Sequence, residues 1–431
     1  MNSSEDLYDK GWILLRDDRI EQIGPGEPPE GLEAGERIRA GGKVIMPGIV
    51  NIHTHVCGSL FKALTEDNKD SFYGLAFPME RFLTPDSVYA LSMLGCIETV
   101  RFGSTLINDI YHHMRSTARA VEEIGLRGVL ASKIYEVDLR RLRYNDYSRI
   151  PGQGEQKLEE NIRLIEECHG KANGRITCRF GPHATDTVSL ELAKKIRLLA
   201  DKYNVGIHIH AAQKEKELDY LRESLGLSPV EYLKESGLAG EKLVAAHCIL
   251  VNDSDIRILH DTRVNVAHCP EIMMKRGHFP PVEKFYAAGL SIALGTDWVT
   301  MNPWTNMRIA VMGARARGMD ENSMNARKVF RMATIDAAKA IGMADQIGSL
   351  EKGKKADLVI MDSRYAHLHP VFDDPIATIV YNATGLEVET VIIDGKTVVE
   401  NGAVVTVDPR AVIGEASGIA GGYLKRQLGK S

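Results

Sequence analysis

The stretch PGIVNIHTH, residues 47–55, decides the fold. It begins with a proline and a glycine, continues as a short apolar run and ends with two histidines two positions apart. Such a run is typical of a β-strand, and side chains at positions i and i+2 of a strand share one face. We therefore expect His53 and His55 to point the same way at the end of a strand.

Seven similar runs follow, and each ends in polar or small residues. Together with the first, the eight predicted strands span residues 48–55, 104–111, 127–135, 175–183, 205–213, 242–248, 263–270 and 290–297. The segments between them have helical periodicity; for example, Ser189 precedes a helix that repeats Leu192, Ile196 and Leu199 on one face. Regular βα alternation implies a parallel sheet, and eight units close into a TIM-type (β/α)₈ barrel. A doubly wound open sheet would need a glycine-rich phosphate turn after an early strand, and none appears.

Shorter β segments flank the barrel on both sides in the sequence. GWILLRDDRIEQIG, residues 11–24, predicts a strand pair, and residues 348–362 and 388–405 return to β character after further helices. Asp394–Gly395 is a typical hairpin turn. These segments predict one small β-sandwich, discontinuous in sequence, over residues 1–46 and 356–431, with the metal-binding barrel over 47–355.

Composition limits the class of protein. The 431 residues are 44% hydrophobic, which is ample for a core, and the net charge of −5 comes from well-mixed charges that indicate no nucleic-acid partner. No apolar run approaches the roughly 20 residues of a membrane span. The polar, acidic N-terminal segment does not resemble a secretory signal, and the six cysteines are scattered without paired spacing. We expect a cytoplasmic protein with reduced thiols, no membrane partner and a small-molecule substrate.

Metal-ligand residues gather at the ends of the predicted strands. A lone His-x-His pair would more often be coincidence than a metal site. Here, however, six of the eight strands end in a histidine or an aspartate: His53 and His55, His183, His208 and His210, His247, His268 and Asp297. Barrel active sites lie at this end of the strands. Nitrogen and carboxylate ligands suit zinc, or a similar ion such as iron or cobalt.

The chain resembles the amidohydrolase superfamily, within the cytosine-deaminase-like and triazine-hydrolase branch that includes chlorohydrolases and S-adenosylhomocysteine deaminases. The matching segments are PGIVNIHTH, GPH at 181–183, IHIHAAQ at 207–213, AAHC at 245–248, AHCP at 267–270, LGTD at 294–297 and KGKKADLVIMD at 352–362. The resemblance covers nearly the whole chain. It implies a distorted barrel flanked by a β-sandwich, one divalent metal (Zn²⁺ foremost, Fe²⁺ as the alternative) and a homodimer or higher homo-oligomer.

Carried over position by position, the resemblance places the metal ligands on His53, His55, His210 and Asp297. It implies that His247 holds the attacking water or polarises the substrate, and that His183 contacts a bound heterocycle. For His208 we expect a structural role and for His268 a supporting one, while the roles of His112 and His113 stay open.

A metal-activated water is expected to attack an electron-poor carbon, with Asp297 accepting the proton of that water. In the deaminases of this branch a glutamate follows the fifth-strand ligand by three residues and carries protons to the leaving group. Here that position is Gln213, whose amide cannot carry a proton. We expect Glu215 and Glu217 to belong to the following loop or helix, whereas Glu271 could point into the site.

Three interpretations follow from Gln213. The enzyme hydrolyses a carbon–nitrogen bond of an N-heterocyclic, amide or urea-like substrate, with Gln213 orienting the ring and another acid helping. Alternatively, it releases a halide, thiolate or carbamate-type group that needs less proton assistance. In the third, the chain is a non-catalytic metal-binding relative, which an intact ligand set disfavours.

Substrate-contacting residues are expected around the strand ends. GTDWVTMNPW, residues 295–304, suggests an apolar wall through Trp298, Met301 and Trp304, with core packing as the competing interpretation for each. Phe61 and Lys62 follow the first ligands and are expected at the entrance. PEIMMKRG, residues 270–277, argues weakly against a nucleoside substrate. The other zinc deaminase class requires a Pro-Cys-x-x-Cys pair after His-x-Glu, and this chain has neither.

Overall fold

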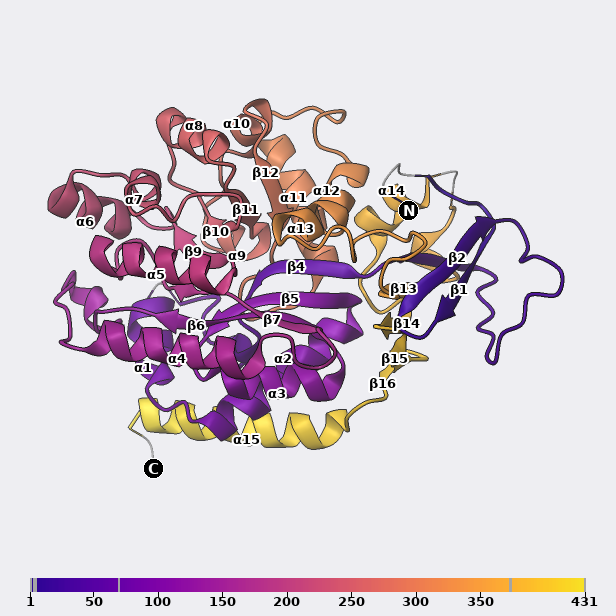
Figure 1. Cartoon of the computed structure of the whole chain (residues 1–431), viewed down its shortest axis with the longest axis horizontal. Helices are drawn as coiled ribbons and strands as arrows, with labels where there is room; N and C mark the ends of the chain where they lie inside the picture. Colours follow the sequence, from indigo (N-terminus) through magenta and orange to yellow (C-terminus); the bar gives the residue numbers. More distant parts are fainter. Residues whose placement is uncertain (1, 3–5, 69, 372–373, 430–431) are drawn as a thin grey trace.

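The computed structural model describes residues 2, 6–68, 70–371 and 374–429, and it contains all eight predicted barrel strands (Figure 1). Only the fourth differs from expectation, because it is interrupted at Arg179–Phe180. The side chain of Asn161 donates to the carbonyl of Arg179 at 2.9 Å and accepts from the amide of Gly181 at 3.1 Å, so it satisfies backbone groups at the break. The strands are β4 (Ile49–Thr54), β5 (Ser104–Tyr111), β6 (Arg127–Ile134), β7 (Ile176–Cys178), β8 (Gly181–Pro182), β9 (Ile207–Ala211), β10 (Leu243–His247), β11 (Asn265–His268) and β12 (Ser291–Leu294).

These strands form two parallel sheets, β4-β5-β6-β7 with β8 beside β6, and β12-β11-β10-β9, which meet along two seams. At one seam the amide of Asp297 donates to the carbonyl of His53 at 2.9 Å, and the amide of His55 donates to the carbonyl of Asp297 at 3.2 Å. At the other seam the amide of His208 donates to the carbonyl of Phe180 at 2.9 Å. The predicted (β/α)₈ barrel is therefore confirmed and closed.

A glycine makes the first seam possible. Gly295 lies where the end of β12 crosses β4, and a Cβ atom at this position would stand 2.7 Å from the Cβ of His53. No larger residue fits without moving the strand that carries the histidine pair.

Helices surround the barrel and also close its lower end. The barrel interior is filled by small and branched residues such as Val50, Ile52 and Val244, and α13 packs against them through Ala337 and Ala338. The opposite end, where the strands finish, is left for the site. The helices of this region are α1 (Phe77–Glu80), α2 (Pro85–Arg101), α3 (Met114–Ile124), α4 (Gln153–Cys168), α5 (Leu190–Tyr203), α6 (Glu215–Leu225), α7 (Pro229–Glu235), α8 (Asp253–Asp261), α9 (Pro270–Met274), α10 (Val282–Ala287), α11 (Pro303–Ala316), α12 (Ala326–Met332) and α13 (Ile335–Ala340), with the short turns η1 (Val56–Phe61), η2 (Ser71–Ala76) and η3 (Arg141–Tyr144).

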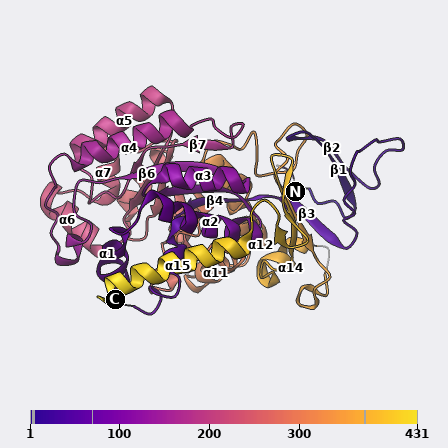
Figure 2. The same ribbon diagram turned by 90° about the horizontal axis from the view of Figure 1, so that it is seen from below.

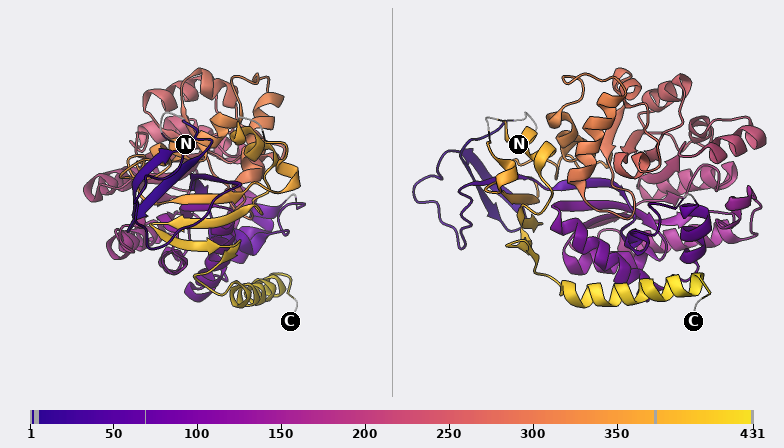
Figure 3. Two further views of the ribbon diagram at one scale, coloured as in Figure 1. Left: turned by 90° about the vertical axis from the view of Figure 1, so that its right-hand side faces the viewer. Right: turned by 180° about the vertical axis from the view of Figure 1, so that it is seen from behind.

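A small β-sandwich stands beside the barrel (Figure 3). A five-stranded sheet in the order β16-β15-β14-β13-β3 faces the β1–β2 hairpin, and Ile20, Leu358, Ile360 and Ile392 are buried between them. The predicted Asp394–Gly395 hairpin is confirmed, with both residues in the left-handed region. The strands are β1 (Gly11–Arg16), β2 (Arg19–Pro25), β3 (Lys43–Pro47), β13 (Leu358–Asp362), β14 (Val388–Ile393), β15 (Lys396–Glu400) and β16 (Ala403–Val404), with η4 (Ala366–Leu368) and α14 (Pro375–Asn382) between them.

The last helix, α15 (Pro409–Gln427), leaves the sheet and runs along the outside of the barrel beside α2 (Figure 2). None of the helices in the described ranges combines the length and the apolar character that a bilayer span requires.

A buried ion pair joins the barrel to the sandwich. Arg127, at the start of β6 and 1% exposed, donates from Nη2 to Asp357 Oδ1 at 3.0 Å and also bonds Asp394. Asp357 in turn accepts from the backbone amide of Asp394 at 2.8 Å. The guanidinium and both carboxylates therefore satisfy one another between the two sheets.

Arg127→Met should destabilise the chain by about 3–5 kcal/mol, because it leaves the buried carboxylate of Asp357 without its cation, while Asp394 keeps only its ion pair with Lys355. Denaturant unfolding measures the change. Arg163→Met, on the exposed face of α4, is the matched control and should change the free energy of unfolding by less than about 0.5 kcal/mol. Equal stability of the two variants would contradict a joining role for Arg127.

Candidate active site

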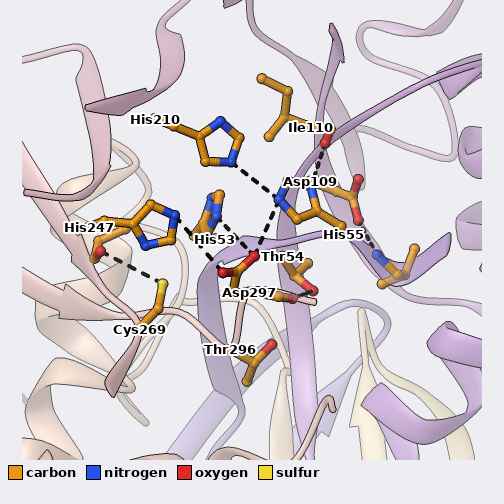
Figure 4. Close-up of polar contacts among 12 residues, drawn as sticks. His53, Thr54, His55, Asp109, Ile110, His210, His247, Cys269, Thr296 and Asp297 are labelled. Carbon is orange, nitrogen blue, oxygen red and sulfur yellow. Dashed lines mark hydrogen bonds and ion pairs between the residues drawn. The ribbon is translucent and has the colours of Figure 1, made fainter. Parts of the chain in front are cut away.

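The predicted ligands converge at the carboxyl end of the barrel strands (Figure 4). His53 lies on β4 and His55 directly after it, His210 lies on β9, and Asp297 follows β12. The Nε2 atoms of His55 and His210 are 3.2 Å apart. Oδ1 of Asp297 lies 3.5 Å from Nε2 of His53 and 3.3 Å from Nε2 of His55.

These spacings fit a single divalent ion. Ligand atoms at a tetrahedral zinc, each roughly 2.0–2.1 Å from the ion, stand roughly 3.3 Å from one another. The Nε2 atom of His53 is buried and has no hydrogen-bond partner within the described residues. An unsatisfied nitrogen of this kind, next to one carboxylate and two further imidazoles, is the donor set that a metal ion would satisfy.

Hydrogen bonds orient each ligand histidine. Nδ1 of His55 lies 2.6 Å from the carbonyl of Ile110, and Nδ1 of His210 lies 2.6 Å from the carbonyl of His183. A carbonyl can only accept, so Nδ1 carries the proton and the Nε2 lone pair faces the centre. Nδ1 of His53 lies 2.7 Å from Nε2 of His208, so the ring of His208 contacts the side of His53 that faces away from Asp297.

Burial also sets the charge of the imidazoles. Burial lowers the pKa of His55, His210 and His247 well below the usual range, and the nearby imidazole of His53 is the second cause in each case. They are neutral and can act as ligands or hydrogen-bond partners.

The backbone is strained where the strands end at the site. His247 and Asp297 adopt φ values of 77° and 62°, in the left-handed region that residues with a side chain seldom occupy. Oγ1 of Thr54 donates to the carbonyl of Asp297 at 2.9 Å, so the strained residue is held from the neighbouring strand. Strain of this kind, in a buried cluster of ligand-type residues, is common at functional sites.

Three further histidines lie around the predicted ligand cluster. Nε2 of His247 lies 3.9 Å from Oδ2 of Asp297, and its ring stacks on His210 with 5.5 Å between centroids. His183 ends the interrupted fourth strand, and its Nδ1 lies 3.1 Å from Oγ1 of Thr187. His268 ends β11 with both ring nitrogens buried and without a partner in the described part of the chain.

Gln213 lies in the loop after β9, where it is partly buried. The nearby carboxylate of Glu217 accepts from the amides of Ala212 at 2.9 Å and Gln213 at 2.8 Å, and also from the hydroxyl of Thr185. Glu215 and Glu217, expected in the following loop or helix, both lie in α6. Glu217 is thus occupied in holding the loop, and its carboxylate does not replace the missing one at position 213.

Three aromatic rings pack together beyond the ends of β4 and β12, and Phe61 is fully buried among them and does not lie at an entrance as expected. Trp298 lies 5.1 Å from Phe61 and 4.7 Å from Phe72 between ring centroids, and the buried Nε1 of Trp298 has no partner among the described residues. Trp304, by contrast, is a packing residue, because it is fully buried and its Nε1 donates to the carbonyl of Phe102 at 3.0 Å. Met301 likewise packs, with its sulfur 3.0 Å from Oγ1 of Thr54.

Glu271 stands apart from the ligands and pairs with Lys275 at 3.0 Å. Its other oxygen, Oε2, is buried and has no partner in the described ranges. The structure therefore leaves one carboxylate oxygen of Glu271 without a partner among the described residues.

A second polar cluster beside the site was missed by the sequence analysis. Glu80 of α1 pairs with His112 at 2.9 Å and with Lys133 of β6 at 3.2 Å, and all three are largely buried. Burial would raise the pKa of Glu80, but Lys133 and His112 outweigh it and bring the pKa to about 2. A lysine inside an otherwise apolar strand was the available signal. Burial lowers the pKa of His112, so its contact with Glu80 is a hydrogen bond from a neutral imidazole.

His208→Ala should weaken metal binding roughly 10- to 100-fold, because it removes the group that orients His53. His208→Gln keeps a polar partner and should lose less. Competition with a chromogenic chelator measures the affinity, and His260→Ala, an exposed histidine of α8, is the control. Unchanged affinity in His208→Ala would show that His53 needs no such support.

The sequence matches the model of the amidohydrolase family over residues 44–398. Similar proteins include the 5-methylthioadenosine/S-adenosylhomocysteine deaminase of Syntrophomonas wolfei, which is 35% identical over 424 residues and matches 96% of this chain and 95% of its own. The 5'-deoxyadenosine deaminase of Methanothermobacter thermautotrophicus is 36% identical over 411 residues, covering 94% and 92% of the two chains.

Solved structures share the fold. An adenosine deaminase from Xanthomonas campestris with bound zinc superposes with a TM-score of 0.87 at 24% identity, covering 96% of this chain and 93% of the other. An atrazine chlorohydrolase from Arthrobacter aurescens complexed with zinc gives a TM-score of 0.85 at 20% identity, with 95% and 94% covered. The chain therefore belongs to the amidohydrolase family and is a metal-dependent hydrolase that acts on carbon–nitrogen bonds.

Proposed function

We propose that this enzyme hydrolyses a carbon–nitrogen bond of a small N-heterocyclic or amide-like substrate, with one Zn²⁺ ion held by His53, His55, His210 and Asp297. The observation that carries the proposal is the set of inward-facing ligand atoms, since the histidines are held from behind and the spacings suit one ion. Fe²⁺ is the alternative occupant of the same ligands.

When bound, the ion supplies Lewis acidity and lowers the pKa of a coordinated water. Asp297 would accept the proton of the attacking water, since its Oδ1 faces His53 and His55 while Oδ2 faces His247. His247 presents Nε2 beside the same carboxylate and donates a hydrogen bond to the substrate atom on which negative charge develops. His183 and Trp298 border the space where a planar ring would lie.

The departing nitrogen needs a proton, and Gln213 cannot deliver one. In our proposal Asp297 returns the proton that it took from the water, and Gln213 orients the substrate by hydrogen bonds. The similarity to deaminases of adenosine derivatives supports ammonia or an amine as the leaving group.

A second candidate is the release of a halide, thiolate or carbamate-type group from the same site. The amide at position 213 favours it, because such groups depart with little or no protonation. A substrate panel read for ammonia, amine, halide and thiol separates the two candidates.

Removal of the metal by a chelator, or the substitution His53→Ala, should abolish turnover, and added Zn²⁺ should restore it only in the wild type. Asp297→Asn should lower kcat roughly 10²- to 10⁴-fold, the usual contribution of a positioned base. Asp261→Asn, an exposed aspartate of α8, is the control for charge loss. Full activity in metal-free protein would rule out the proposal.

Gln213→Glu tests the leaving group. If Asp297 carries the proton, this substitution should change carbon–nitrogen hydrolysis of the best panel substrate by less than about tenfold, as should the control Gln156→Glu on the exposed face of α4. A rise of 100-fold or more in ammonia release from aminated heterocycles would instead show that deamination requires a carboxylate that the native chain lacks. That result would favour the second candidate.

A further inference from the structure

Two cationic side chains at the carboxyl end of the barrel strands pair with no acidic group in the described part of the chain. Lys214 follows β9, and Arg276 lies in the loop after β11 and α9, so both stand at the same end of the barrel as the ligands. Within the described residues neither side chain makes an ion pair or a hydrogen bond, and the Nη2 atom of Arg276 is buried without any partner.

Both cations lie instead against aromatic rings. Nζ of Lys214 is 3.7 Å from the ring centre of Phe72 and 4.3 Å from that of Tyr73. Cζ of Arg276 is 4.4 Å from the ring centre of Phe72 and 5.6 Å from that of Trp298. Loops after β4, β9, β11 and β12 thus combine into one surface, which we term the cationic wall: Phe72, Lys214, Arg276 and Trp298.

The carboxylates near the cationic wall have other partners. Glu217 holds the loop after β9, Asp297 faces the predicted metal ligands, and Asp186 bonds Tyr147. Glu66, which faces Arg276, accepts from the amide of Thr65. None of these carboxylates makes an ion pair with Lys214 or Arg276 among the described residues. Burial and the charge of Arg276 together lower the pKa of Lys214 to about 7, against the opposing effect of Asp186, Glu217 and Asp297.

Unmatched positive charge in a partly buried site is costly unless an anion joins it. A metal ion would add further positive charge beside the wall. Cation–aromatic contacts offset part of the cost, yet they leave the guanidinium donors of Arg276 unsatisfied. A bound anion would balance the charge of both side chains and accept hydrogen bonds from the donors of Arg276.

We propose that the substrate carries an oxyanionic group such as a carboxylate, which Arg276 and Lys214 bind while its ring or amide packs against Phe72 and Trp298. The inference rests on the proposed function, since it takes the metal centre as the place where the substrate reacts. Arg276 supplies a planar pair of donors and Lys214 a point charge, a combination suited to a carboxylate. Arg276 and Lys214 are thus specificity-determining residues.

Binding by the metal-loaded full chain tests this directly. Matched probes differ only in the anion: cytosine against 5-carboxycytosine, and hydantoin against hydantoin-5-acetate. Calorimetry should show the carboxylate member binding at least tenfold more tightly. Arg276→Met and Lys214→Met should each bring the ratio of affinities toward one, Arg276→Lys should keep part of it, and the exposed control Arg163→Met should leave it unchanged.

A ratio near one in the wild type would overturn the inference, as would variants that preserve the ratio. If the two cations only brace the aromatic loop, the variants weaken both members of a pair equally, and the inference fails. Melting temperature and metal content identify any variant that does not fold, in which case Arg276→Lys decides. The affinity ratio needs no turnover, so failure of the proposed hydrolysis is seen separately, in the substrate panel.

Discussion

The hydrogen bonds between Asp297 and β4 are the constraint on which the rest of the site depends. The amide and carbonyl of Asp297 bond the carbonyl of His53 and the amide of His55, so the residue that closes the barrel also brings its carboxylate to both histidines. Gly295 permits the approach, and Thr54 holds the strained backbone in place. The same hydrogen bonds therefore close the barrel and position the carboxylate of Asp297 beside His53 and His55.

Backbone groups of the barrel also orient two of the other predicted ligands. His55 and His210 are oriented by carbonyls of neighbouring barrel strands, and the second of these carbonyls belongs to His183, itself a residue of the site. By contrast, His53 is oriented by a side chain, because its Nδ1 contacts Nε2 of His208. A site oriented largely by backbone loses little order in the absence of metal, because the barrel keeps the acceptors where they are.

The sequence predicts those parts of the fold in which apolar residues repeat at the spacing of a strand or a helix. Eight strands are visible because their apolar runs alternate with helices, and His53 and His55 share a face by strand geometry alone. The break in the fourth strand is not visible, because it depends on the side chain of Asn161, which reaches the strand from the preceding helix. The sequence does not predict the contacts of Lys214 and Arg276 for a similar reason. Both side chains contact Phe72 from separate loops of different length, and no local sequence pattern indicates such a contact. The sequence shows directly that residue 213 is a glutamine. Only the structure shows that the carboxylate of Glu217 accepts a hydrogen bond from the amide of Gln213.

The five-stranded sheet pairs β3 with β13, so residues 43–47 find their partner only at residues 358–362. During synthesis at roughly 5–20 residues per second, the early strand waits for roughly 15–60 seconds before that partner leaves the ribosome. The hairpin β1–β2 waits equally, with Ile20 uncovered, because its buried surroundings come from the same late strands. The N-terminal β segments of this enzyme therefore stay without their final partners while the barrel strands beside them are already being made.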